Sequence, residues 1–303
     1  MNVHPDCFAC FMKQAVATLG YAGVADEGKP DMLKAVLAEL STADMHEPPA
    51  YATTFMYRKI KELTGRDPYS EIKRTYNDEA MKFYRALRAS VKAAEDPLWN
   101  AARLAIAGNI IDFGIYSSVD IEGTVKRAMK PTIEVDDYPA FKAEAERADR
   151  ILYLMDNAGE CVFDMLLIEV LIDMGKDVTA VVKGGPVIND ATMDDARQVG
   201  LTELCAVVDN GSDAVGTIFS LCRADFKDFF DSFPMIISKG QGNFETLQKV
   251  DKNIFFLFQA KCDVIANALG LENGAMLLKR GGANQMVLDK GYGLWYYNRR
   301  TNS

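Results

Sequence analysis

The chain has almost no histidine: His4 and His46 are the only two among its 303 residues. Histidine is the side chain most often used for proton transfer near neutral pH, and it is a frequent ligand of zinc. Its scarcity nearly excludes histidine-based catalysis and a metal site built from several histidines. Acid–base or metal chemistry in this protein must therefore rely on carboxylates, amides, lysines or thiols.

Long apolar runs and a leader sequence are also missing. No stretch approaches the roughly 20 apolar residues of a membrane-spanning helix. The N-terminus lacks the basic start and the apolar stretch of a signal peptide. We therefore expect no membrane partner and a cytoplasmic location. The six cysteines are then expected to be thiols or metal ligands rather than a disulfide framework.

Basic residues are outnumbered in this chain. The 34 lysines and arginines face 43 aspartates and glutamates, which gives a net charge of −9 at pH 7 and a pI of about 4.9. Nucleic-acid binding needs a basic surface, so we expect no nucleic-acid partner. A small anionic substrate remains compatible, because a pocket can be locally positive in an acidic protein.

Several widespread catalytic and nucleotide-binding signatures are absent. The chain contains no Gly-x-x-x-x-Gly-Lys-Ser/Thr phosphate loop and no Gly-x-Ser-x-Gly elbow. Its first predicted strand is followed neither by Gly-x-Gly-x-x-Gly nor by the Asp-x-Asp pair of haloacid-dehalogenase-type phosphatases. These absences argue against P-loop enzymes, dinucleotide-binding enzymes and serine hydrolases.

What the first half does contain is helical periodicity. Prolines and acidic residues stand at the expected helix starts, and apolar residues recur at helical spacing. The predicted helices cover residues 7–19, 31–40, 51–63, 69–94, 98–107 and 140–148, and no strand pattern appears before about Ile151. We therefore predict a helical region over residues 1–145, with a small inserted helical subdomain at about 45–95.

The second half alternates short apolar runs with helical segments. The runs are Ile151–Met155, Val178–Val182, Leu204–Val208, Met235–Ile237 and Ile254–Phe258. Such alternation is typical of βαβ units, so we predict an α/β domain over residues 146–303, with a mostly parallel sheet and flanking helices. The segments 285–289 and 294–297 predict a final hairpin.

Polar residues and glycines follow each predicted strand. The stretches are Asp156-Asn157-Ala158-Gly159-Glu160, Lys183-Gly184-Gly185-Pro186 with Asn189-Asp190 beyond it, Asp209-Asn210-Gly211-Ser212, Lys239-Gly240-Gln241-Gly242-Asn243 and Gln259-Ala260-Lys261. Because the carboxyl ends of parallel strands share one edge of a sheet, these groups should gather around one crevice, where open α/β sheets bind ligands. The helix expected after the first strand would also offer free N–H groups to an anion.

This combination suits a divalent cation beside a phosphate. Asp156, Asn157 and Asp190 supply the oxygen ligands that hard cations prefer. Lys239 and Lys261 supply positive charge for a phosphate. Taken singly, each acidic or amide residue is more often a turn residue or a helix cap. Complementary charges at most of the strand ends nevertheless favour one metal–phosphate site.

Two other motifs stay open. Cys7 and Cys10 share one helix face and could form a soft-metal clip or a redox pair, although two buried small side chains explain the spacing as well. Asn109 and Asp112 lie near a predicted helix end, where they could cap the helix or face the crevice from the helical half.

Six motifs follow one another along the chain: His4-Pro5-x-Cys7-x-x-Cys10-x-x-x-Gln14, Gly65-x-Asp67-Pro68-Tyr69, Gly108-Asn109-x-x-Asp112, Asp156-Asn157-Ala158-Gly159-Glu160, Pro186-x-x-Asn189-Asp190 and Lys239-Gly240-Gln241-Gly242-Asn243. This ordered set resembles domain-of-unknown-function family 89, whose members are described as metal-dependent damage-control phosphatases. The motifs span nearly the whole chain, and the Cys-x-x-Cys start resembles the stand-alone prokaryotic branch.

The resemblance implies a helical N-terminal region packed on a Rossmann-like α/β domain. It implies a divalent cation (Mn²⁺, Co²⁺, Ni²⁺ or Mg²⁺) held by Asp156, Asn157 and Asp190. The substrate contacts that it implies are Glu160, Lys239, Gly240, Gln241, Gly242, Asn243 and Lys261. The implied activity is hydrolysis of small phosphorylated metabolites, including sugar phosphates and damaged or side-product metabolites.

We therefore hypothesise phosphomonoester hydrolysis with Asp156, Asp190 and Glu160 as the catalytic carboxylates. Asp156 could be a ligand only or the nucleophile, and without a nearby histidine Glu160 or Asp190 is the remaining acid–base candidate. Two alternatives stay open: an S-adenosylmethionine-dependent carboxyl methyltransferase, and a non-catalytic module that binds a metal and a phosphometabolite. The oligomeric state, the physiological substrate and the cellular metal stay open as well.

Overall fold

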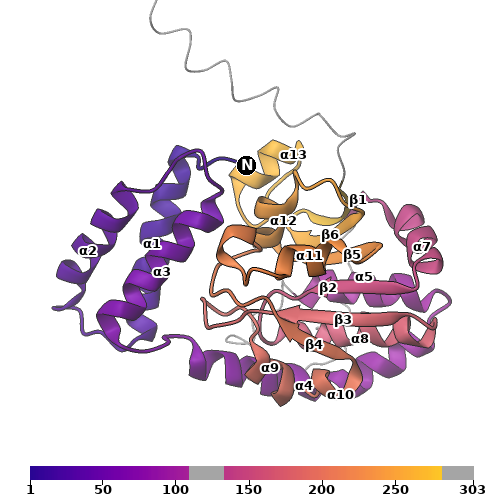
Figure 1. Ribbon diagram of the computed structural model, residues 1–303. Helices are drawn as coiled ribbons and strands as arrows, with labels where there is room; N and C mark the ends of the chain where they lie inside the picture. The colour runs from indigo at the N-terminus through magenta and orange to yellow at the C-terminus, as the bar shows by residue number, and fades with distance from the viewer. Residues whose placement is uncertain (109–132, 282–303) are drawn as a thin grey trace, which may run out of the picture.

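The structure is a computed structural model that describes residues 1–108 and 133–281 (Figure 1). The first described helices are α1 (Pro5–Tyr21), α2 (Lys29–Ser41), α3 (Pro49–Thr64), α4 (Ser70–Lys92) and α5 (Pro97–Ala107). In the described ranges, no helix is both long and apolar enough to cross a membrane. The candidates Asn109 and Asp112 and the predicted hairpin over 285–297 lie outside the described residues.

From residue 133 onward, strands alternate with helices. In chain order the elements are β1 (Ile133–Asp136), α7 (Tyr138–Arg147), β2 (Arg150–Leu154), α8 (Glu160–Asp173), β3 (Asp177–Val182), α9 (Met193–Gln198), α10 (Leu201–Leu204), β4 (Ala206–Asp209), the 3₁₀ helix η2 (Phe219–Leu221), α11 (Phe226–Asp231), β5 (Met235–Lys239), α12 (Gln241–Leu247), β6 (Ile254–Gln259), α13 (Asp263–Leu269) and β7 (Met276–Arg280). The predicted α/β class, with helices first and a mostly parallel sheet after them, is confirmed.

The strands form one sheet in the order β1-β7-β6-β5-β2-β3-β4. The β6–β7 pair is antiparallel, and the other paired strands of the sheet run parallel. The chain builds β3 and β4 on one side of β2 and then crosses to build β5 and β6 on the other. The strand order therefore reverses between β2 and β5, and in open α/β sheets such a reversal leaves a ligand-binding crevice at the carboxyl ends.

Helices cover both faces of the sheet (Figure 1). Ile151 and Tyr153 of β2 face a core shared with α4, α5, α7 and α8. Leu152 and Leu154 face the opposite core, which α11, α12 and α13 complete. Because both faces of the central strand are buried, apolar residues follow one another along it without the alternation of a half-exposed strand.

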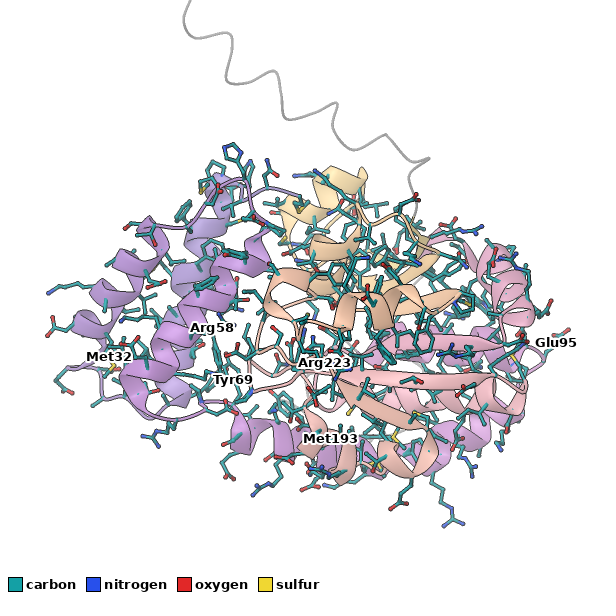
Figure 2. The ribbon with its side chains drawn as sticks, in the orientation of Figure 1. Met32, Arg58, Tyr69, Glu95, Met193 and Arg223 are labelled. Carbon is teal, nitrogen blue, oxygen red and sulfur yellow. The ribbon has the colours of Figure 1, made fainter. Side chains whose placement is uncertain are left out.

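The first three helices form a cluster of their own beside the sheet (Figure 1). Phe11 of α1, Val36 of α2 and Met56 of α3 belong to this cluster, whereas α4 and α5 share the core of the sheet. Arg58, which Figure 2 shows on α3, joins the two parts, because its Nε donates to Asp213 Oδ1 at 3.0 Å. The predicted division at residue 145 and the predicted insert at 45–95 stay predictions.

The expectation that no strand precedes Ile151 is wrong. β1 pairs in parallel with β7 at one end of the sheet. It has only four residues, and they alternate between buried or half-buried and exposed positions. So short an edge strand offers too few positions for a period to be detected. The run Met276–Leu278 of β7 was also missed, and it is buried because β7 lies between β1 and β6.

Candidate active site

The loops after β2 and β3 are joined at the carboxyl edge of the sheet. Asn157 and Asp190 form an antiparallel backbone bridge. Next to it, the N–H of Ala191 donates to the carbonyl oxygen of Asp156 at 2.7 Å. The three predicted ligands Asp156, Asn157 and Asp190 are therefore brought together, as the strand-end argument predicts.

The Asp156 carboxylate lies among other negative charges. Burial raises the pKa of Asp156 well above its usual value, and the charges of Glu160 and Asp190 raise it further. Lys261 and Lys239 act in the opposite direction without cancelling this rise. Each of these carboxylates makes ionisation of the others less favourable. A divalent cation bound between them would stabilise their ionised forms.

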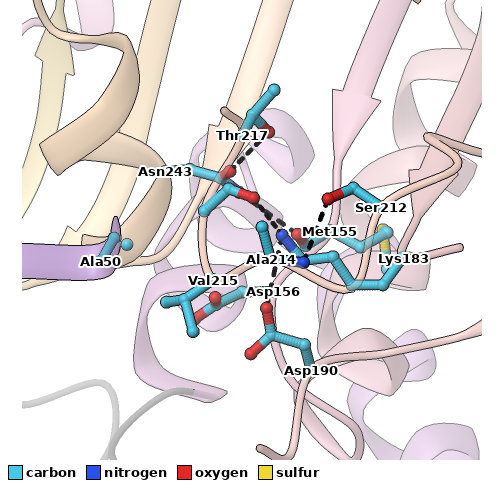
Figure 3. Close-up of polar contacts among 12 residues, drawn as sticks. Ala50, Met155, Asp156, Lys183, Asp190, Ser212, Ala214, Val215, Thr217 and Asn243 are labelled. Atoms are coloured by element: carbon cyan, nitrogen blue, oxygen red, sulfur yellow. Dashed lines mark hydrogen bonds and ion pairs between the residues drawn. The ribbon is translucent and has the colours of Figure 1, made fainter. Parts of the chain in front are cut away.

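Lys183 belongs to this site, although neither the predicted ligands nor the predicted substrate contacts include it. Its almost fully buried ammonium lies 3.4 Å from Asp190 Oδ2 (Figure 3). It also donates a hydrogen bond to the carbonyl oxygen of Gly216. Burial raises the pKa of Asp190 despite the opposing charge of Lys183. The sequence signal that identifies Lys183 is its position as the first polar residue after an apolar strand.

Asn157 links two of the carboxylates through its side chain. Its Nδ2 donates to Asp156 Oδ2 at 2.9 Å and to Glu160 Oε2 at 3.1 Å. Because the nitrogen is engaged in this way, the amide oxygen is the Asn157 atom that could serve as a cation ligand. The same two hydrogen bonds fix the relative positions of Asp156 and Glu160.

Lys239 lies below the crevice, with its side chain fully buried at the end of β5. Its ammonium donates to Glu160 Oε1, Asp164 Oδ1 and the carbonyl oxygen of Ala105, each at 2.7 Å. Tyr153 donates its hydroxyl to the same Asp164 oxygen at 2.8 Å. These contacts make Lys239 the support of Glu160, and its direct contact with a substrate stays a prediction.

Asp164 is a buried acid that the sequence prediction did not single out. It lies on α8 one helical turn after Glu160, so both carboxylates reach the Lys239 ammonium. Burial raises the pKa of Asp164 to about 6. The charge of Glu160 raises this pKa as well, whereas the charge of Lys239 lowers it and limits the rise. The sequence signal that identifies Asp164 is an acidic residue in the first turns of an otherwise apolar helix. Such an acid is expected to be buried, and a buried acid needs a polar or charged partner.

Asn243 holds the loop after β5 in place. Its side chain is buried, and its Nδ2 donates to the carbonyl oxygens of Lys239 at 2.8 Å and Met155 at 3.3 Å. Its Oδ1 accepts a hydrogen bond from Thr217 Oγ1 at 2.8 Å (Figure 3). These bonds engage both polar atoms of the amide, so Asn243 joins the ends of neighbouring strands. Its predicted contact with the substrate stays a prediction.

Gln241 and Lys261 lie on the more open side of the crevice. Gln241 Oε1 accepts from the backbone N–H of Lys261 at 2.9 Å, while its Nε2 donates to Glu245 Oε1 at 2.9 Å. The side chain of Lys261 is exposed, and its charge lowers the pKa of Asp156. Lys261 therefore has the location expected of a cation that meets an anionic substrate at the carboxylates.

Two glycines allow the loops to approach one another closely. Gly240 has φ +82°, and a Cβ at this position would lie 2.1 Å from the Oδ2 and Cγ atoms of Asp156. A Cβ on Gly216 would lie 2.3 Å from the carbonyl oxygen of Gly242. The predicted Gly-Gln-Gly loop therefore places its backbone directly against the Asp156 carboxylate.

Gly240→Ala is expected to lower the phosphomonoester hydrolysis hypothesised from the sequence on the order of a hundredfold, because its Cβ, 2.1 Å from two atoms of the Asp156 carboxylate, must displace that carboxylate by about an ångström. Gly175→Ala is the matched control: Gly175 has φ +80°, and a Cβ there would meet nothing within 4 Å. The control variant should lose only about 1–2 kcal/mol of stability from the left-handed backbone. Turnover rates and denaturant midpoints of both variants measure the difference, and equal activities would contradict the packing argument.

The oxygen donors of the crevice fit a hard divalent cation. Among residues 1–108 and 133–281, no group of three or more His, Cys, Asp and Glu side chains could hold a metal ion. The predicted set differs in kind, since it joins the carboxylates of Asp156 and Asp190 to the amide oxygen of Asn157. Such ligands suit Mg²⁺ and Mn²⁺. The pKa of both carboxylates is raised, and a bound cation would lower it again by stabilising their ionised forms.

The Cys-x-x-Cys pair lies on α1 as free thiols. Partial burial raises the pKa of Cys7 and Cys10, and the charges of Glu245 and Cys262 add to the rise. Because the charge of Cys262 acts on both thiols, Cys262 lies near the pair. A raised thiol pKa disfavours the thiolate that a redox pair needs. The interpretation as two buried side chains is wrong for Cys10, which is exposed, while Cys7 is half-buried. The soft-metal interpretation stays open.

Three comparisons with known proteins agree with this arrangement. A family model described as "Damage-control phosphatase ARMT1-like domain" matches residues 3–277. A protein from Pyrococcus horikoshii named a damage-control phosphatase is 34% identical and aligns over 92% of this chain and 98% of its own. Another of that name from Archaeoglobus fulgidus is 31% identical over 76% of this chain and 82% of its own.

The fold has a close counterpart among solved structures. The crystal structure of a DUF89 family protein from Pyrococcus horikoshii matches with a TM-score of 0.87 and 32% sequence identity. The match covers 93% of this chain and 99% of that one.

Proposed function

Because the chain belongs to the damage-control phosphatase ARMT1-like domain family, we propose that it hydrolyses small phosphorylated metabolites with a divalent cation. The substrate class we propose is sugar phosphates and related damaged or side-product metabolites. The cation (Mn²⁺, Co²⁺, Ni²⁺ or Mg²⁺) would be held by Asp156, Asn157 and Asp190.

The observation that carries this proposal is the bridge between Asn157 and Asp190. It joins loops from two different strands, and together they contribute two carboxylates and an amide to the crevice between β2 and β5. If these residues were only turn residues and helix caps in separate loops, no bridge between the two loops would be needed. Oxygen ligands at the ligand-binding edge of an α/β sheet support metal-assisted phosphate chemistry.

The surrounding residues have separable tasks in this reaction. When bound, the cation would polarise a phosphoryl oxygen and lower the pKa of a nearby water. Lys261 would offset the charge of the phosphoryl group from the open side of the crevice. Glu160 is oriented by Asn157 and by Lys239, and it shares the acid–base assignment with Asp190.

Removal of divalent cations should lower hydrolysis of p-nitrophenyl phosphate by about a hundredfold or more, because the cation supplies several kcal/mol of stabilisation to the transition state. Mn²⁺ or Co²⁺ added back should restore turnover, and a panel of sugar phosphates should then identify the preferred substrate. Turnover that is indifferent to chelation would contradict metal dependence. Binding of metal and phosphosugar without turnover would favour the sensing module, and binding of labelled S-adenosylmethionine would favour the methyltransferase.

A further inference from the structure

Helix α4 contacts both loops that carry the predicted cation ligands. Lys73 and Asn77 are one helical turn apart on α4 and share one face of the helix. The two residues are 5% and 0% exposed. Two polar side chains buried this deeply must end on polar partners, and those partners lie next to Asp156, Asn157 and Asp190.

Asn77 holds the loop after β2. Its Oδ1 accepts a hydrogen bond from the backbone N–H of Gly159 at 2.7 Å. Gly159 is the N-cap of α8, with φ +76°, and it lies two residues after Asn157. The Nδ2 of Asn77 donates to Asp195 Oδ1 and to Gln198 Oε1, each at 2.9 Å. One amide therefore joins the start of α8 to the helix α9 that follows the loop after β3.

Lys73 holds the loop after β3 from the same side. Its ammonium donates to Asp195 Oδ2 at 2.8 Å and to the carbonyl oxygen of Asp190 at 3.3 Å. Asp195 in turn accepts hydrogen bonds from the backbone N–H of Thr192 at 2.9 Å and from its hydroxyl at 2.7 Å. The backbone of the predicted ligand Asp190 is thus connected to α4 through Lys73.

We propose that Asn77, supported by Lys73, is a positioning residue of the cation site. This inference rests on the proposed function, because it concerns the ligands named there. Asn77 fixes the backbone at Gly159, two residues after Asn157. Through Asp195 it also fixes the backbone at Thr192, two residues after Asp190. The helical N-terminal half therefore sets the spacing between ligands that come from the α/β half.

Asn77→Ala tests this without changing any charge, so a change in cation affinity reports geometry. The dissociation constant of Mn²⁺ should rise about tenfold or more, which is typical when a residue that orients metal ligands is removed. Titration calorimetry measures it at a temperature where circular dichroism shows the variant fully folded. Tyr84→Phe is the matched control. The Tyr84 hydroxyl of α4 donates to Glu169 Oε1 of α8 at 2.6 Å, so it also joins α4 to α8, but away from the loops that carry the predicted ligands.

Lys73→Met is the second variant and keeps the inference testable if Asn77→Ala does not fold. Loss of a positive charge near Asp190 would by itself tighten cation binding, whereas loss of positioning weakens it. We expect weaker binding of Mn²⁺, and Lys73→Arg should restore most of the affinity.

The outcomes separate this inference from the function on which it rests. An unchanged Mn²⁺ affinity in Asn77→Ala, or an equal loss in Tyr84→Phe, overturns the positioning role while the cation site stands. If Asn77→Ala does not fold, tighter binding in Lys73→Met overturns it instead. An Asp156→Ala variant that binds Mn²⁺ as tightly as the wild type overturns both the cation site and the inference.

Discussion

Asp156→Asn is expected to lower metal-dependent hydrolysis by about three orders of magnitude while the metal-free protein stays at least as stable as the wild type. The activity falls because a cation ligand is lost, and a cation contributes several kcal/mol to the transition state. The stability is kept because burial and the charges of Glu160 and Asp190 already raise the pKa of Asp156. A neutral amide of the same shape removes that repulsion.

Two measurements check this expectation for Asp156. Values of kcat/KM with Mn²⁺ report the loss of catalysis, and melting temperatures with and without Mn²⁺ report the loss of binding. Mn²⁺ should raise the wild-type melting temperature, since a ligand that binds only the folded state stabilises it. The variant should show no such rise.

Asp209→Asn is the matched control for this prediction. Asp209 ends β4 at the same edge of the sheet, and its Oδ1 accepts a hydrogen bond from the backbone N–H of Gly211 at 2.9 Å, as expected of a turn residue. The same change of charge there should leave turnover and the Mn²⁺-dependent rise in melting temperature intact. An equal loss in both variants would show that general acidity of the edge, rather than a defined ligand, is what matters.

The convergence of Asp156, Asn157 and Asp190 could be predicted from the sequence because parallel strands impose it. Apolar runs marked β2 and β3, and residues after the carboxyl ends of such strands meet at one edge whatever the details of packing. The bridge between Asn157 and Asp190 confirms this proximity. The bounds of these strands were predictable for the same reason, since buried strands leave uninterrupted apolar runs.

The direction in which each strand-end side chain points could not be predicted. Lys239 and Lys261 both follow apolar strands, yet one is fully buried beneath Glu160 and the other is exposed. The register of each strand and the packing of α8 decide between these positions, and neither is encoded locally. Asn77 illustrates the same limit, because its partner Gly159 is distant in the chain and α4 alone looks like an ordinary amphipathic helix.

Lys239→Met is expected to destabilise the fold by about 3–5 kcal/mol, the usual cost of leaving buried charges without their partner. The ammonium of Lys239 is fully buried against Glu160 and Asp164, which raise its pKa in spite of the burial. A methionine fills a similar volume but leaves two carboxylates facing one another. Urea denaturation measures the loss. Lys142→Met is the matched control, because Lys142 pairs with Asp96 Oδ2 at 3.0 Å on the surface, where such pairs contribute about 1 kcal/mol or less.

The pH dependence of the Lys239→Met defect distinguishes lost charge pairing from lost packing. Burial already raises the pKa of Asp164 to about 6 in the presence of Lys239, and removal of the ammonium raises it further. A carboxyl group whose pKa is higher in the folded state than in the unfolded state favours folding at low pH and opposes it as the pH rises. The defect should therefore grow as the pH rises above about 6, because Asp164 ionises beside Lys239 in the wild type but is held protonated, at a rising cost, in the folded variant. A defect that is the same across this range would mean that Lys239 contributes through its packed methylene groups, and the assignment of Lys239 as the counter-charge of Glu160 and Asp164 would fail.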